Sequence, residues 1–220
     1  IEEFKHPIIP DELLSICGFI GRVAKYSYEN APVPNKVMSF VGALALQSYL
    51  CGRKVKGMND TMPNLYLLGL GFSSSGKEFP RNVNSQILNA IGRGSDLGSK
   101  FASAEGIEDA LFQNPCMLFQ TDEIDTILDS IKTGKDQRYS LIMSFLMNLY
   151  SASSSVMQKR SKGLNGQSNN NQKGLVYPFL TLFGTAVPTY YYQSISQKMF
   201  TNGFFGRMLV FQSYKKEKFR

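Results

Sequence analysis

The stretch LGLGFSSSGKEFPRN, residues 68–82, decides how the rest of the chain is interpreted. Gly71 is followed by four residues and then by Gly76 and Lys77. This is the spacing of a phosphate-binding loop, in which glycines let backbone N–H groups converge on phosphate oxygens and a lysine reaches the outer phosphates. The same residues also suit an ordinary serine-rich turn. The predicted phosphate contacts are Gly71, Ser73, Ser74, Ser75, Gly76, Lys77 and Glu78.

The flanking segments favour the phosphate-binding interpretation. Residues 64–72, NLYLLGLGF, form a short apolar run that predicts a buried strand, and residues 78–92 predict a helix with Pro80 in its first turn. Glu78 stands where this motif normally has Ser or Thr as a Mg²⁺ ligand. A carboxylate can still hold the metal, but it adds negative charge beside a triphosphate. We therefore predict a site for ATP with Mg²⁺ whose rate of hydrolysis is open.

A second motif, CMLFQTDEID, places Asp122 and Glu123 after an apolar run, 45 residues beyond Lys77. Carboxylates at the end of a buried strand suit phosphate hydrolysis: Asp122 is predicted to hold the metal together with Glu78, and Glu123 to polarise the attacking water. The intervening Gln120-Thr121 predicts a slight outward shift of both carboxylates. The alternative is an exposed acidic turn in which Asp125 and Asp129 begin a solvated helix.

Two further residues beside predicted strands are also candidates for contacts with the nucleotide, with weaker support. Thr185 ends the predicted strand in FLTLFGTAVP, where a hydroxyl can touch the γ-phosphate or the water. Arg207 precedes the strand in NGFFGRML, and an arginine that reaches a neighbouring subunit's nucleotide supplies transition-state charge. Ordinary turn chemistry and a surface arginine are the alternatives.

Elsewhere, apolar spacing predicts helices over Leu13–Tyr26, residues 34–51, 103–114 and 138–152, and strands within 116–124, 175–188 and 204–214. Gly52 is expected to end a helix, and Ser103 is expected to cap one. Strands that alternate with helices predict an α/β sheet with helices on both faces. We expect a helical segment over residues 1–60 and a core over 61–220. Because the chain starts at Ile1 and ends in KKEKFR, we expect it to be a piece of a longer protein.

Charge is distributed unevenly along the chain. The net charge is +7, yet no acidic residue occurs between Asp136 and Glu217. This basic third suits a polyanion, with a solvated basic surface as the alternative. Its polar segment 161–174 is expected to be a mobile loop. The tyrosine run 190–192 could stack on bases, but core or interface packing is favoured. The predicted single-stranded DNA contacts are Lys159, Arg160, Lys162 and Lys173.

The remaining composition excludes other classes of protein. No apolar run approaches the length of a membrane span and no signal peptide is evident. Three separated cysteines, Cys17, Cys51 and Cys116, are interpreted as reduced core residues of a cytoplasmic protein.

Taken in order, these motifs resemble the ATPase domain, RecA/AAA+-like, that accompanies primase domains in phage and plasmid replicative primase-helicases. The resemblance implies a P-loop NTPase core, ATP hydrolysis, assembly into a ring such as a hexamer, DNA translocation and a primase partner. It assigns Gly76 and Lys77 to phosphate, Asp122 and Glu123 to metal and water, Thr185 to sensing of the γ-phosphate, and Arg207 to the arginine finger or sensor.

Three functions follow as hypotheses. The first is a DNA-dependent ATPase, the motor of a replicative helicase. The second, favoured by Glu78, is a non-catalytic assembly module that recruits replication partners when nucleotide binds. A small-molecule kinase is the third, and both the Asp122-Glu123 pair and the acid-free third argue against it.

Overall fold

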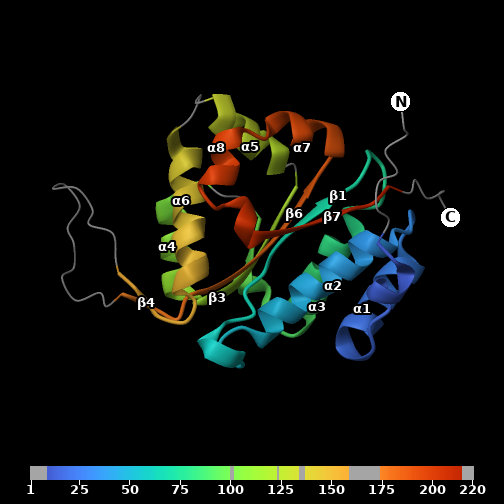
Figure 1. Cartoon of the computed structure of the whole chain (residues 1–220). Coiled ribbons are helices and arrows are strands. Elements are labelled where there is room, and N and C mark those ends of the chain that lie inside the picture. The colour runs from blue at the N-terminus through green and yellow to red at the C-terminus, as the bar shows by residue number, and fades with distance from the viewer. Residues whose placement is uncertain (1–8, 100–101, 123, 134–136, 159–173, 215–220) are drawn as a thin grey trace.

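The computed structural model describes residues 9–99, 102–122, 124–133, 137–158 and 174–214. Its centre is a parallel sheet of five strands in the order β2-β3-β6-β1-β7 (Figure 1). These strands are β1 (Tyr66–Leu70), β2 (Leu97–Gly98), β3 (Cys116–Thr121), β6 (Phe179–Ala186) and β7 (Met208–Gln212). Every residue of β1 and β6 is buried, as continuous apolar runs predict for a parallel sheet that is covered on both faces.

The amino-terminal helices cover one face of the sheet. They are α1 (Gly18–Asn30), α2 (Lys36–Cys51) and α3 (Phe79–Ala90), which lie together on one side of the strands in Figure 1. Phe40 and Leu46 of α2 share a core with Leu67, Leu118 and Phe183 of the sheet. The predicted amino-terminal helical segment is therefore packed directly on the strands.

The opposite face is covered by the helices that follow β2. They are α4 (Ala104–Gln113), α5 (Ile124–Thr133), α6 (Gln137–Ala152), α7 (Pro188–Ser194) and α8 (Gln197–Thr201). Ile107, Leu128 and Phe145 pack there on Leu68 and Leu182. The chain is thus an α/β fold with helices on both faces, as the alternation of elements predicted.

The strand register defines the two edges of the sheet. Leu70 pairs with Ala186 on one side and with Gln212 on the other, and Thr121 pairs with Gly184. The carboxyl ends of these four strands therefore meet at one edge. β1 leads to α3 on one face, whereas its neighbour β6 leads to α7 on the other. A crevice between two strands that diverge in this way is where open α/β sheets bind ligands.

A short antiparallel pair, β4 (Val156–Met157) with β5 (Leu175–Val176), lies at the amino-terminal edge. It immediately precedes the start of β6, where the Phe179 N–H donates to the Pro115 carbonyl at 2.8 Å. Figure 1 shows β4 at the far end of the sheet from α7. The predicted DNA contacts, Lys159, Arg160, Lys162 and Lys173, and nearly all of the predicted loop 161–174 lie between β4 and β5 but outside the described residues.

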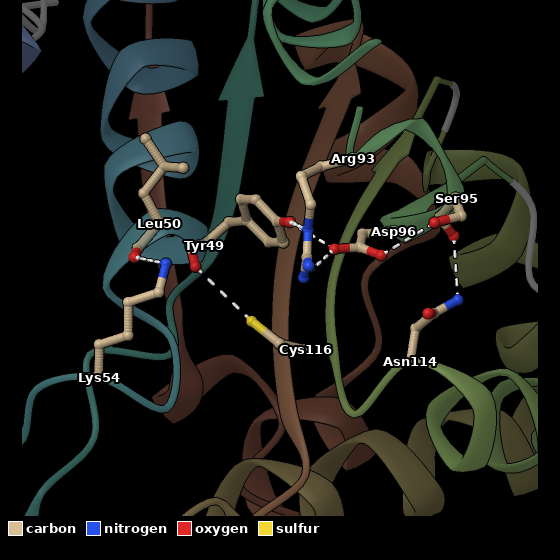
Figure 2. Close-up of polar contacts among 8 residues, drawn as sticks. All are labelled: Tyr49, Leu50, Lys54, Arg93, Ser95, Asp96, Asn114 and Cys116. Carbon is tan, nitrogen blue, oxygen red and sulfur yellow. Dashed lines mark hydrogen bonds and ion pairs between the residues drawn. The ribbon is translucent and has the colours of Figure 1, made fainter. Parts of the chain in front are cut away.

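A polar cluster around the buried residues Tyr49 and Asp96 closes the same amino-terminal edge (Figure 2). Asp96, 2% exposed, accepts a hydrogen bond from the Tyr49 hydroxyl at 2.5 Å and pairs with Arg93 at 2.6 Å. Burial and the bond to Asp96 raise the pKa of Tyr49 to about 12. The Cys116 thiol also donates to the Tyr49 carbonyl at 3.6 Å. Because every member bonds another, we interpret this cluster as structural.

Several predictions need correction. The helix expected over Leu13–Tyr26 is interrupted: residues Asp11–Leu14 form a 3₁₀ turn, and α1 begins only at Gly18. Cys17 is exposed rather than buried, although all three cysteines are free. The tyrosine run is divided, because Tyr191 is buried while Tyr190 and Tyr192 are more than half exposed. Other predictions are confirmed: Gly52 follows the end of α2, and the Ser103 hydroxyl accepts from the Gly106 N–H at 3.0 Å as a helix cap.

No helix in the described part of the chain has the length and apolar character needed to cross a membrane.

Candidate phosphate-binding site

The loop between β1 and α3 is a tight turn held against its surroundings. The Gly71 N–H donates to the Ala186 carbonyl of β6 at 3.1 Å, and the Ser75 N–H donates to the Phe72 carbonyl at 3.2 Å. Ser74 and Gly76 have positive φ angles of 59° and 73°. Alternation of ordinary and left-handed residues turns successive N–H groups toward one point, which is how backbone concavities bind anions.

Asn35 anchors this loop from outside. Its side-chain oxygen Oδ1 caps α2 by accepting from the Met38 N–H at 3.1 Å. Its side-chain Nδ2 donates to the Ser75 carbonyl and to the Ser213 hydroxyl, both at 3.1 Å. Ser213 in turn follows β7 and donates its N–H to the Leu70 carbonyl at 2.8 Å. One buried side chain therefore links the α1–α2 connection, the loop and the end of β7. No sequence pattern indicated this role, although Asn is a common cap before a helix.

The loop presents unpaired donors at the start of α3. In the part of the chain that the structure describes, the N–H groups of Gly76, Lys77 and Glu78 make no hydrogen bond. Ser75 is 2% exposed, and its buried hydroxyl also lacks a partner among the described residues. The first N–H groups of a helix have no partner within the helix, and they attract anions together with the helix dipole. The donor set therefore fits a phosphate group.

Gly76 cannot carry a side chain without a clash. A Cβ at this position would lie 2.0 Å from the Val33 carbonyl oxygen, in the connection between α1 and α2. Its φ of 73° is also unfavourable for L side chains. The glycine that the motif requires is thus required by the fold of this chain as well.

We expect Gly76→Ala to lower the free energy of unfolding by about 1–3 kcal/mol and to weaken ATP binding about tenfold or more, because the loop must move off Val33. Thermal unfolding and calorimetric titration with ATP measure both effects. Gly92→Ala is the matched control, since Gly92 has a φ of 71° with no atom within 4 Å of the added Cβ. If the two variants lost the same stability and the same ATP affinity, the result would contradict this account of the loop.

Lys77 lies between two hollows at the carboxyl edge of the sheet. The larger has a volume of about 580 Å³ and is bounded by the loop, α5 and α7, with Ser73, Asp125 and Tyr190 in its wall. The smaller, of about 410 Å³, is lined by Val33 and neighbouring residues of the α1–α2 connection and of the α3 start. A molecule bound at the loop therefore has space on both sides of the Lys77 side chain.

Asp122 directly follows β3 at the same edge. β3 continues through Gln120 and Thr121, both buried, so Asp122 lies two residues beyond the apolar run. The slight outward shift of the two carboxylates stays a prediction. Burial of a glutamine is possible here because its amide donates to the Arg81 carbonyl and the Ser85 hydroxyl at 3.2 Å, and accepts from Asn84 at 3.0 Å.

Both oxygens of Asp122 have partners. The register places Asp122 beside Thr185, whose hydroxyl donates to Oδ1 at 2.7 Å, and Arg81 Nη2 lies 2.9 Å from Oδ2. Burial alone would raise the pKa of Asp122, but the Thr185 hydrogen bond and the positive charges of Arg81 and Lys77 outweigh it and hold the pKa below its ordinary value. Asp122 is therefore an anion at neutral pH, within the electrostatic reach of Lys77.

The structure brings together most of the predicted phosphate site. The loop residues Gly71 to Lys77, together with Asp122 and Thr185, all lie at the carboxyl edge of neighbouring strands. Thr185 is fully buried, and its hydroxyl donates a hydrogen bond to the Asp122 carboxylate. Arg81 was not predicted from the sequence. Its only signal was a position four residues after Lys77, in the first turn of the helix that follows the loop.

The two carboxylates named in the metal prediction have different surroundings. Glu78 is exposed and lines the smaller hollow with Val33, whereas the oxygens of Asp122 are bonded by Thr185 and Arg81. The described residues contain no group of three His, Cys, Asp or Glu side chains arranged around a metal position. Mg²⁺ at Glu78 and Asp122 stays a prediction, and Glu123 lies outside the described residues.

Arg207 is not brought to the site of its own chain. It precedes β7, whose first residue, Met208, pairs with Tyr66 at the start of β1. Its guanidinium donates to the Gly203 carbonyl at 2.9 Å and to the Ser151 hydroxyl at 3.4 Å. Arg207 therefore lies at the amino-terminal edge, opposite Lys77, and action on a neighbouring subunit stays a prediction.

The comparisons with known proteins give no family for this chain: no protein-family model matches it, and no curated protein is significantly similar.

Proposed function

We propose that the chain binds ATP at the 71–78 loop and hydrolyses it, as the motor of a helicase or primase-helicase that acts on single-stranded DNA. The observation that carries the proposal is the combination of unpaired N–H groups at Gly76 to Glu78, the Lys77 ammonium beside them and an ionised Asp122 across the β1–β6 crevice. The strand order supports it: because β6 separates β1 from β3, the acid lies roughly 10 Å sideways from the loop strand, two strand spacings away, which leaves room for phosphate.

Each residue has a definite task in this proposal. The backbone donors of the loop bind phosphate oxygens, and Lys77 neutralises charge on the outer phosphates. Thr185 fixes the orientation of Asp122 through its 2.7 Å hydrogen bond. Glu123, the next residue along the chain, orients the attacking water and accepts its proton. The two hollows beside Lys77 receive the parts of the nucleotide and the water on either side of the phosphates.

Steady-state ATP hydrolysis, measured with and without a single-stranded oligonucleotide, tests this function. We expect turnover that rises when the oligonucleotide is added. ATP binding without turnover in either condition would favour the second candidate, a nucleotide-gated assembly module that recruits a primase or other replication partner. The observation in its favour is that Arg81 and Thr185 already satisfy the oxygens of Asp122. The oligomeric state with and without an ATP analogue then tests ring assembly.

The basic segment between β4 and β5 gives a prediction for DNA. We expect simultaneous replacement of Lys159, Arg160 and Lys162 by alanine to weaken binding of all oligonucleotide sequences and to flatten its salt dependence. Each lost phosphate contact removes about 0.7 from the log–log slope. Fluorescence anisotropy at several salt concentrations measures both. ATP binding should be unchanged, because β4 and β5 lie at the opposite edge from Lys77.

A matched control replaces Lys25, Lys54 and Arg22, which are exposed cations of the described helical face and its connections. If this control variant and the first variant lose the same affinity, the effect is one of net charge, and the basic segment is an ordinary solvated surface or a protein interface.

A further inference from the structure

The smaller of the two hollows at the loop has largely apolar walls. Pro32 and Val33 of the α1–α2 connection form one side, and Phe79 at the start of α3 forms another. Outside the loop itself, its polar side chains are those of Glu78 and Asn82. A hollow of about 410 Å³ with apolar walls and a few polar groups is typical of a site for a small organic molecule.

The larger hollow has an acidic wall instead. Asp125 and Asp129 of α5 both line it, and Tyr190 is the aromatic side chain in its described wall. Because α5 begins at Ile124, two residues after Asp122, this hollow lies on the side of the proposed chemistry. Carboxylates and hydroxyls bind water and cations rather than an apolar ring. An uncharged base therefore fits the smaller hollow better.

Glu78 and Asn82 present adjacent side chains to the smaller hollow. The Asn82 N–H donates to the Glu78 carbonyl at 3.2 Å, so this turn is helical, and residues four apart on a helix are neighbours on its surface. Both residues are exposed, and neither side chain makes a hydrogen bond or an ion pair with another described residue. Their polar atoms are therefore available to a ligand.

The smaller hollow is continuous with the phosphate-binding loop. Residues 74–77 are part of its wall, and they include two of the unpaired N–H groups, those of Gly76 and Lys77. A Cβ on Gly76 would lie 2.0 Å from the Val33 carbonyl oxygen, so the loop and the apolar wall are in direct contact. A nucleotide whose phosphates lie at the loop can thus place its base and sugar on the α1–α2 side of Lys77.

We infer that the smaller hollow is the nucleoside subsite, in which Asn82 hydrogen-bonds the edge of adenine and Glu78 hydrogen-bonds the ribose. The inference rests on the proposed ATP site and adds the residues that set its specificity. A carboxamide can accept from the N6 amino group of adenine and donate to N7, whereas guanine presents an acceptor, O6, in place of the amino group. A carboxylate accepts hydrogen bonds from ribose hydroxyls. In this role Glu78 selects the sugar and is not a ligand of Mg²⁺.

Calorimetric titration of the whole chain with ATP and with GTP, both in excess Mg²⁺, tests the role of Asn82. The wild type should bind ATP about tenfold more tightly than GTP, and Asn82→Ala should bring the two affinities within about threefold. Gln86→Ala is the matched control and should keep the wild-type ratio, because Gln86 is an exposed amide of α3 that does not line the hollow. Equal affinities in the wild type, or a preference that survives in Asn82→Ala, overturn the assignment. If Tyr190→Ala removes the preference instead, the base lies in the larger hollow and the inference is wrong.

The same titration with ATP and with 2′-deoxy-ATP tests the role of Glu78. The wild type should bind ATP about fivefold or more tightly, because a hydrogen bond to a charged group is lost with the 2′-hydroxyl, and Glu78→Ala should bind the two within about twofold. Glu105→Ala should keep the wild-type ratio, since Glu105 is an exposed acid of α4 on the other face of the sheet. An equal ratio for the wild type and Glu78→Ala overturns the ribose contact. If Glu78→Ala weakens both nucleotides alike and does so only when Mg²⁺ is present, Glu78 is a metal ligand instead.

These ratios separate the inference from the proposed function. A loss of folding or of phosphate contacts weakens all the nucleotides alike, so it leaves the ratios unchanged. A wild type that binds ATP, GTP and 2′-deoxy-ATP equally overturns the inference and leaves the phosphate site and the proposed function intact. If the wild type binds none of them, the proposed function fails and this inference fails with it.

Discussion

Lys77→Ala is expected to reduce ATP affinity on the order of 100-fold while the protein stays folded. The lysine is the side-chain cation at the mouth of the loop, between the two hollows, and a charge-assisted bond to phosphate is among the stronger polar contacts. No core residue depends on it, because its side chain reaches the crevice rather than the packed faces of the sheet. Calorimetric titration measures the affinity, and thermal unfolding confirms the fold.

Lys25→Ala is the control for Lys77→Ala, because Lys25 is an exposed cation of α1 that pairs with Glu29 at 3.8 Å. It should leave ATP affinity unchanged. A folded Lys77→Ala variant with wild-type affinity would remove the phosphate assignment of the loop, and the serine-rich turn would then be an ordinary connection between β1 and α3.

The second large effect concerns hydrolysis rather than binding. Glu123→Gln is expected to keep ATP affinity and to lower kcat by a factor on the order of 10² or more, because the amide cannot accept a proton from the attacking water. Single-turnover hydrolysis of bound ATP measures the chemical step directly. A loss of ATP binding instead would make Glu123 a ligand or a structural residue.

Asp129→Asn is the matched control for this variant. Asp129 is an exposed carboxylate on α5 and lines the larger hollow, so it lies near the site without a proposed part in the chemistry. We expect its kcat to stay close to that of the wild type. If Asp129→Asn loses as much activity as Glu123→Gln, the negative charge of this wall matters and the assignment of a single general base is wrong.

The elements that the sequence predicted well are those with long apolar patterns and clear ends. The β1–loop–α3 unit was expected because an apolar run, a glycine-rich turn and a proline in the first helical turn follow one another. β2 was missed because it has only two residues, Leu97–Gly98, too few for any pattern. The start of α5 was predicted only as the alternative interpretation of the Asp122-Glu123 motif, since carboxylates at this point of the sequence suit either a metal site or the start of a helix.

The residues of the candidate site also divide into those that the sequence predicted and those that it did not. Loop residues, Asp122 and Thr185 were predicted because each ends or follows a strand, and carboxyl ends of parallel strands share an edge. The contacts of Asn35 and Arg81 were not, because they join segments 40 and 41 residues apart and depend on how helices pack on the sheet. Arg207 lies at the amino-terminal edge of its own chain because β7 is parallel to β1, and its predicted action on a neighbouring subunit's nucleotide stays a prediction.

The measurement that tests the central claim most directly is a titration of the isotope-labelled protein with ATP, followed by the backbone amide resonances. The account predicts saturable shifts at Gly76, Lys77 and Glu78, whose N–H groups have no partner in the described structure, while the resonances of Arg93 and Asp96 at the opposite edge stay in place. Absence of shifts at residues 76–78, or saturable shifts confined to the Arg93–Asp96 edge, would contradict it.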